Sequence, residues 1–128
     1  MQDGIFRSAG HKSRFVTAMQ QLGKHDAGKL DPEYASAVYI LTSDDFTWEK
    51  ASGYVSRRGI LFDDLLDEVD FSSGYRILIQ LAGNLFNGGQ HIDPVEFMRL
   101  DEGNFGVAQV AIHLRRHSAH LNDFKGEE

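Results

Sequence analysis

Residues 72–89 read SSGYRILIQLAGNLFNGG and carry the strongest structural pattern in the chain. Ser72 or Ser73 can begin a helix, because a hydroxyl oxygen accepts hydrogen bonds from the unpaired backbone N–H groups of a first turn. The Asn-Gly-Gly sequence at 87–89 can end it, because both residue types tolerate the left-handed backbone conformation that closes a helix. The sequence therefore predicts one helix over most of this stretch.

Apolar side chains surround most of the predicted helix. At about 100° per residue they form one broad face, made of Tyr75, Ile77, Leu78, Ile79, Leu81, Ala82, Leu85 and Phe86. A helix with so wide an apolar face must be covered on several sides, so we expect it to be the central helix of a helical domain. A buried strand over 77–81 is the competing interpretation, but the apolar run is too long for one strand and has a helical period.

Cap and proline signals place further helices on both sides of this stretch. Asp31-Pro32 and Asp93-Pro94 each combine a capping carboxylate with a proline suited to the first helical position. Ser8 can cap another helix, which Gly23 would end. We expect helices over about 9–22, 31–41, 44–53, one or two turns within 63–70, a short helix over 94–100, and a last helix from 104 or 105 to 121. We detect no internal repeat.

One segment suits a small β-hairpin. Tyr54-Val55 and the apolar residues 60–62 flank Arg57-Arg58-Gly59, where Gly59 can take a positive φ. We interpret 24–30 as a polar loop. The fold class we predict is mainly α: a single small helical domain over 1–128, with about six helices around the central buried helix and room for one short hairpin at 54–62. Residues 1–8 would be an N-terminal arm and 122–128 a frayed tail.

Composition excludes several kinds of site. The chain has 128 residues, no cysteine and a formal net charge of −6. Disulfides, thiolate metal sites and a cysteine nucleophile are therefore excluded. No apolar run approaches the roughly 20 residues that a membrane-spanning helix needs, and no signal-peptide pattern precedes the first helix. We expect a cytoplasmic protein without membrane contact.

A strip of polar residues on the central helix is the candidate ligand-binding site. Arg76, Gln80 and Asn84 interrupt its apolar surface at helical spacing. On a helix that is otherwise buried, these groups would lie in a groove. The alternative interpretation, which we favour, is a solvent-facing edge or an ion pair with an acidic residue of 67–70.

The last helix carries three histidines, and we expect no metal there. His113, His117 and His120 would share one face, and a pair spaced by four residues can hold a metal. No further ligand accompanies them, however, and Arg116 would repel a cation. The acidic residues of 63–70 do not have calcium-loop spacing and are expected to be solvated. We therefore predict no metal and no cofactor.

The last two helices could form a helix-turn-helix, but their sequence argues against it. The N-terminal half of a recognition helix brings polar and basic side chains to base edges. Here that half reads FGVAQVAI at 105–112, which is suited to a core. Together with the negative net charge, this predicts no specific nucleic-acid binding.

Two blocks resemble a known family. The resemblance rests on residues 72–89 and on the later block LDEGNFGVAQVAI. The segment GYVSRRGILF, which precedes residues 72–89, also fits that family. The family that the chain resembles consists of short bacterial proteins of unknown function that are often associated with mobile elements. The resemblance covers about 14–113. It implies a bacterial or phage origin and a small, mostly helical fold, and it supplies no catalytic residues.

These observations favour an accessory protein that acts by protein–protein contact, with a homodimer as one form of such contact, and they lean against an enzyme. The alternative is a small-ligand binder or enzyme that uses a groove around Arg76, Gln80 and Asn84. A deep pocket with converging polar groups would favour the alternative. A flat or self-complementary apolar patch would favour protein contact.

Overall fold

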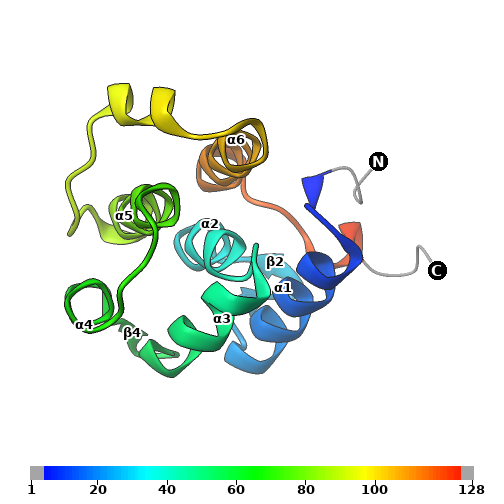
Figure 1. Cartoon of the computed structure of the whole chain (residues 1–128). Coiled ribbons are helices and arrows are strands. Elements are labelled where there is room, and N and C mark those ends of the chain that lie inside the picture. The colour runs from blue at the N-terminus through cyan, green and yellow to red at the C-terminus, as the bar shows by residue number, and fades with distance from the viewer. Residues whose placement is uncertain (1–4, 125–128) are drawn as a thin grey trace.

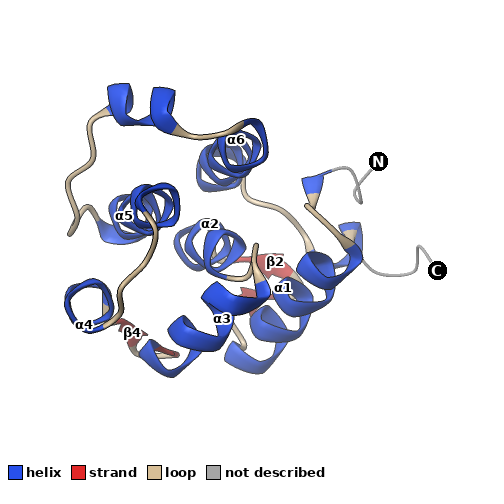
Figure 2. Cartoon of the chain, viewed as in Figure 1, coloured by secondary structure: helices blue, strands red, loops and turns tan. Residues whose placement is uncertain are grey.

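The computed structural model describes residues 5–124, which fold into six α-helices (Figure 1). The helices are α1 (Ala9–Leu22), α2 (Pro32–Leu41), α3 (Asp45–Ala51), α4 (Phe62–Glu68), α5 (Ser73–Asn87) and α6 (Glu102–His117). The strands of the described residues form two small antiparallel pairs, drawn in red in Figure 2. The predicted mainly α class is confirmed.

The most enclosed helix is α2, which corrects the expectation that 72–89 would be central. Every residue of α2 from Tyr34 to Leu41 is buried, and Figure 1 shows the other helices on all sides of it. Small side chains at Ala35, Ser36 and Ala37 let neighbouring helices approach closely from several directions. Helix α5 is less enclosed than α2, because its polar strip is in contact with solvent. Its buried side forms a second layer of the core.

Several predicted helix ends are confirmed. The Ser8 side chain accepts from His11 N–H and begins α1, and Gly23 ends that helix with φ 66°. The Asp31 carboxylate accepts from the second and third residues of α2. Gly88 closes α5 with φ 75°, whereas Ser72 stands at the start of α5 without a side-chain capping bond.

Two antiparallel hairpins precede α2 and α4. The pair β3 (Val55–Ser56) and β4 (Gly59–Ile60) confirms the hairpin predicted at 54–62. The pair β1 (His25–Asp26) and β2 (Lys29–Leu30) lies where a loop was expected. The two hairpins have the same strand pairing, and the second follows the first by 30 residues along the chain. The chain therefore repeats a helix–hairpin–helix unit, which we did not detect in the sequence. The Tyr34 hydroxyl donates to Ser56 O at 2.8 Å and ties the second hairpin to α2.

The segment after α6 pairs with the first hairpin instead of continuing the helix to residue 121. Ser118 has φ 62° and ψ −173°, a conformation outside the helical region, so α6 stops at His117. Leu30 N–H then donates to Ala119 O at 2.8 Å, and Leu121 N–H donates to Gly28 O at 2.7 Å. These hydrogen bonds are favoured over a longer α6, because they also give partners to the backbone groups on the free edge of the first hairpin.

The described parts of both chain ends contribute to the core, which corrects the predicted arm and tail. The Phe6 ring contacts His11, Phe15, Tyr39 and Phe124. Phe124, which falls within the predicted frayed tail, is only 4% exposed. The remaining arm and tail residues, 1–4 and 125–128, lie outside the described range.

Within residues 5–124, no helix combines the length and the apolar character that crossing a membrane requires.

Candidate functional site

Two of the three predicted site residues line one groove. Arg76 and Gln80 face a groove of about 390 Å³ between α5 and the 3₁₀ helix η3 (Pro94–Arg99). Asn84 is not part of its lining, and its side-chain amide donates to Gln90 O at 3.0 Å instead. The polar strip therefore extends one helical turn beyond the groove, and its role as a ligand-binding site stays a prediction.

Arg76 is held by the backbone rather than by an acidic side chain. Its Nη1–H donates to Leu66 O at 3.2 Å. The expected ion pair with an acidic residue of 67–70 is not formed between described side chains. Arg76 is exposed, in agreement with a solvent-facing edge.

Four other polar groups of the groove have partners within it. Nε2 of His91 lies 3.0 Å from Asp93 Oδ1, and Arg99 Nη1 donates to Glu96 Oε1 at 2.8 Å. Two apolar side chains, Ile77 and Ile92, also line the groove. Paired and solvent-exposed charges of this kind contribute little binding energy to a small ligand, because a ligand must first displace their partners.

The helix η3 beside the groove has three distinct faces. With about three residues per turn, residues three apart in a 3₁₀ helix lie directly above one another. Phe97 and Leu100 form the inner row and pack against the core. Glu96 and Arg99 form the charged row that lines the groove. Val95 and Met98 form the third row, and they are 68% and 69% exposed.

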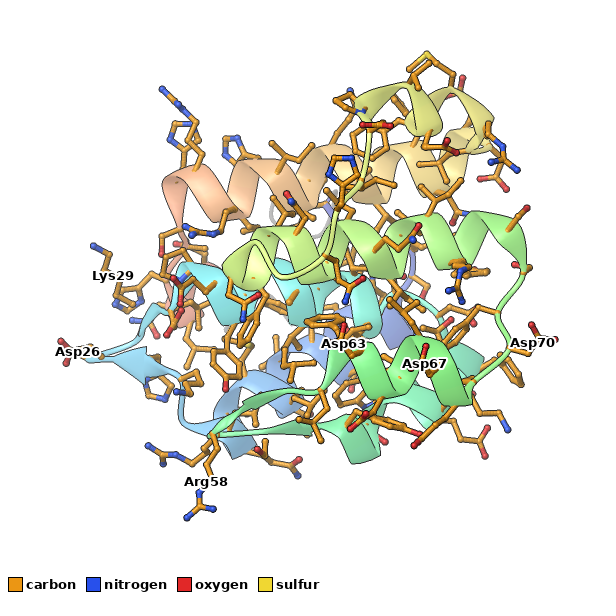
Figure 3. The ribbon with its side chains drawn as sticks, turned by 90° about the vertical axis from the view of Figure 1, so that its left-hand side faces the viewer. Asp26, Lys29, Arg58, Asp63, Asp67 and Asp70 are labelled. Carbon is orange, nitrogen blue, oxygen red and sulfur yellow. The ribbon has the colours of Figure 1, made fainter. Side chains whose placement is uncertain are left out.

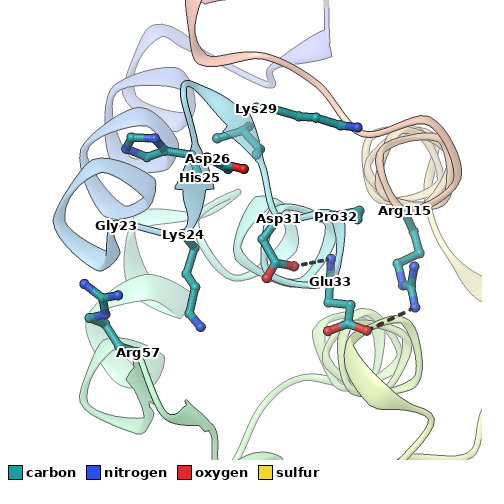
Figure 4. A pocket seen from close by; sticks show the side chains of 11 residues that line it. Gly23, Lys24, His25, Asp26, Lys29, Asp31, Pro32, Glu33, Arg57 and Arg115 are labelled. Carbon is teal, nitrogen blue, oxygen red and sulfur yellow. Dashed lines mark hydrogen bonds and ion pairs between the residues drawn. The ribbon is translucent and has the colours of Figure 1, made fainter.

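A larger pocket, of about 600 Å³, was not predicted from the sequence. It lies between the first hairpin, the start of α2, Arg57 of the second hairpin and Arg115 of α6 (Figure 4). Arg115 Nε–H donates to Leu85 O at 2.7 Å, which holds this side chain between α5 and α6. Its lining comes from segments up to 92 residues apart, from Gly23 to Arg115. No local motif signals such a site.

The three histidines near the C-terminus do not share one face. The rings of His113 and His117 lie side by side on α6 with their centroids 4.5 Å apart. His120 lies beyond the helix, where its Nε2 is 3.0 Å from Ala27 O. No three His, Asp or Glu side chains within 5–124 are grouped so that they could hold a metal ion.

The acidic stretch of α4 is a solvated face. Asp63, Asp67 and Asp70 point outward from the molecule (Figure 3). Glu68 accepts a hydrogen bond from the Tyr54 hydroxyl, and Asp63 accepts one from the Gln90 amide. These contacts join α4 to the second hairpin and to the loop after α5.

A histidine with a strongly displaced pKa has a structural position. Burial is the main cause that lowers the pKa of His11 to about 4. The ring lies among Phe6 and Tyr39 and lines neither pocket. A shifted pKa in a cleft can mark catalysis, but this one is in the core.

Comparison with protein-family models, curated proteins and solved structures finds no match for this chain. The resemblance to a bacterial family associated with mobile elements therefore stays a prediction.

Proposed function

We propose that this chain is an accessory binding protein that acts by contact with another protein, and that the Val95–Met98 row of η3 is the surface it presents. The observation that carries the proposal is the exposure of these two side chains. They are the most exposed large hydrophobic residues in the described chain, and they lie in one row of one short helix.

The geometry of η3 supports a binding role for this row. A chain can bury the apolar side chains of a short helix on its own core, as Phe97 and Leu100 do here. Val95 and Met98 form a separate row that is mostly exposed and has no such cover. Complete burial of a Val or Met side chain is worth about 1.5–3 kcal/mol, so a partner that covers both gains substantial affinity.

The surroundings of the row suit a protein better than a small molecule. Paired charges, Glu96 with Arg99, flank the apolar row on one side. An apolar centre with a polar, solvated rim is the usual anatomy of a protein interface. Methionine also adapts its shape readily to a partner surface. The alternative, a small-ligand site around Arg76 and Gln80, has less support because most charges in that groove are already paired.

Affinity capture from the source organism tests the proposal. The bait would be the full chain, compared with a Val95→Asp/Met98→Asp double variant. Leu61→Asp is the matched control, because Leu61 is 57% exposed and lies at the start of α4. Thermal melts would first verify that all baits fold. We expect one protein to be captured by the wild type and the control but not by the double variant.

Binding of the purified candidate then decides the question. Calorimetry should show at least a tenfold weaker affinity for the double variant and an unchanged affinity for Leu61→Asp. Light scattering of the chain alone shows whether the partner is a second copy. Equal binding by wild type and double variant, or no partner sensitive to these residues, would contradict the proposed surface.

A further inference from the structure

The pocket between the two hairpins is lined by four cations and three carboxylates, so its lining has a net positive charge. It is lined by the four cations Lys24, Lys29, Arg57 and Arg115, together with carboxylates of the first hairpin and of α2. It shares no residue with η3 or with the Arg76 groove, so it is independent of the surface described above.

The two carboxylates of α2 that line the pocket already have partners. Asp31 Oδ1 accepts from the backbone N–H groups of Glu33 and Tyr34, at 2.9 and 3.3 Å. Glu33 Oε2 lies 3.6 Å from Arg115 Nη2. The third carboxylate, Asp26, is at the tip of the first hairpin and points away from the molecule (Figure 3).

Three of the four cations, Lys24, Lys29 and Arg57, have no acidic partner among residues 5–124, and side-chain contacts fix the positions of two of them. Lys24 Nζ lies 4.4 Å from the centroid of the Tyr34 ring. The Arg57 guanidinium covers Gly23, so closely that a Cβ added there would be 3.1 Å from Nη1. Neither forms an ion pair with a carboxylate of residues 5–124.

Both cations belong to one side of the pocket. Gly23, which Arg57 covers, is the neighbour of Lys24, and Figure 4 shows the two side chains on the same side of the pocket with Arg115 opposite. The charge of Arg57 also acts on the Tyr34 hydroxyl, where it opposes the rise in pKa caused by burial. Two nearby like charges repel each other, and an anion placed between them would remove that repulsion.

We propose that this pocket binds the phosphate group of a small phosphorylated molecule, with Lys24 and Arg57 as its ligands. A phosphate monoester carries a charge of about −2 near neutral pH, which balances two cations, whereas one carboxylate balances only one. The planar guanidinium offers two parallel N–H donors to phosphate oxygens, and the lysine adds a point charge. A volume of about 600 Å³ also leaves room for an organic group attached to the phosphate.

Titration calorimetry of the full chain at low salt tests this with three probes: inorganic phosphate, glycerol phosphate and a nucleoside monophosphate. Acetate is the singly charged control. We expect phosphate to bind and acetate to bind more weakly. A higher affinity for one of the two esters than for inorganic phosphate would identify the kind of organic group that the rest of the pocket accepts. Phosphate binding equal to that of acetate would overturn the proposal.

The neighbouring arginines provide a matched pair of variants. Arg57→Ala and Arg58→Ala change the net charge equally, but Arg58 does not line the pocket and points away from the molecule (Figure 3). Loss of a charge-assisted contact should weaken phosphate binding about tenfold or more in Arg57→Ala, and similarly in Lys24→Met. Arg58→Ala should bind like the wild type. Equal weakening in both arginine variants would indicate diffuse attraction and contradict a site. Neither outcome bears on the η3 surface.

Discussion

His11 joins the first helix to the central one, because its Nε2 lies 2.9 Å from the main-chain oxygen of Tyr39. Its Nδ1 accepts a hydrogen bond from Arg7 N–H at 3.1 Å. Since Nδ1 is an acceptor, the proton of the neutral ring is on Nε2, which donates to Tyr39. The neutral ring is therefore fully bonded, and a second proton on Nδ1 would break the bond to Arg7.

This arrangement predicts that acid destabilises the fold through His11. Burial, reinforced by Arg14 and Arg7 and opposed by the bond to Tyr39, lowers the pKa of His11 from 6.5 to about 4. Between these values the unfolded chain binds a proton that the folded chain does not. The contribution to stability is therefore complete above about pH 7 and is lost as the pH falls to about 4. The loss amounts to roughly 3 kcal/mol, measurable by denaturant melts over a pH series.

A pair of identical substitutions isolates the contribution of His11. His11→Gln removes the titrating group, so its free energy of unfolding should depend less on pH between 7 and 4 than that of the wild type, although it is lower at pH 7. His91→Gln changes a histidine whose side chain is 86% exposed, and this control should keep the acid sensitivity that His11 causes. Parallel curves for wild type and His11→Gln would show that the buried ring does not carry the effect.

Gly28 is predicted to be irreplaceable because of both its backbone and its neighbour. It has φ 89°, and an added Cβ would overlap the ring of His120, with Nε2 2.9 Å away. Gly28→Ala should therefore lower the free energy of unfolding by more than the roughly 1 kcal/mol expected of the backbone strain alone. Chemical denaturation would measure it.

Two further variants separate strain from overlap at this position. In a His120→Ala background, Gly28→Ala should cost less, because the overlap is gone and only the strain remains. Gly53→Ala is the control, since nothing lies within 4 Å of its added Cβ, and it should change stability by less than about 0.5 kcal/mol. A cost of Gly28→Ala that is the same in both backgrounds would mean that His120 moves away freely.

The core position of α5 predicts different costs for two leucines that the sequence pattern treats alike. Leu78 is fully buried, whereas Leu85 is only partly buried against the core. Leu78→Ala should cost about 2–5 kcal/mol, from lost transfer energy and a residual cavity. Leu85→Ala should cost less, because solvent can fill the space it leaves. Denaturant melts in which both variants lose less than about 0.5 kcal/mol would show that α5 is peripheral to stability.

The sequence predicted the features that depend on local chemistry. Asp31-Pro32 begins a helix, Gly23 and Gly88 end helices, and the 54–62 segment forms a hairpin, because caps, prolines and positive-φ glycines act within a few residues. The first hairpin was missed because its strand positions are mostly polar and one turn position, Ala27 with φ 54°, is not a glycine.

Features that depend on distant parts of the chain could not be predicted. The backbone bonds between β2 and residues 119–121 end α6 early, yet no pattern in the last helix signals their partner. The central place of α2 depends on how closely its neighbours approach, not on its own period. The pocket lined by Lys24 and Arg57 likewise combines residues of two hairpins that are 30 residues apart in the chain. Only the fold brings these hairpins together.

We expect no specific binding of nucleic acid by this chain at physiological salt. The formal net charge of the chain is −6. In α6, the candidate recognition helix, Val107, Ala108 and Ala111 are buried in the core, and its basic residues, Arg115 and Arg116, lie in the last turn. A recognition helix reads bases from its N-terminal half, so α6 cannot enter a groove in that way without unpacking. The few cations near the hairpins can attract the singly charged phosphodiesters of a nucleic-acid backbone only without sequence preference and at low salt. Any such binding should fade as salt rises, because counterion release would drive it.

Mobility shifts over a salt series, with random and source-genome fragments, measure this. A sequence-selective complex that persists near about 150 mM salt, where charges separated by more than a Debye length are screened, would contradict the prediction. Loss of that complex in Arg57→Ala but not in Arg116→Ala would then place the contact at the hairpins rather than at α6.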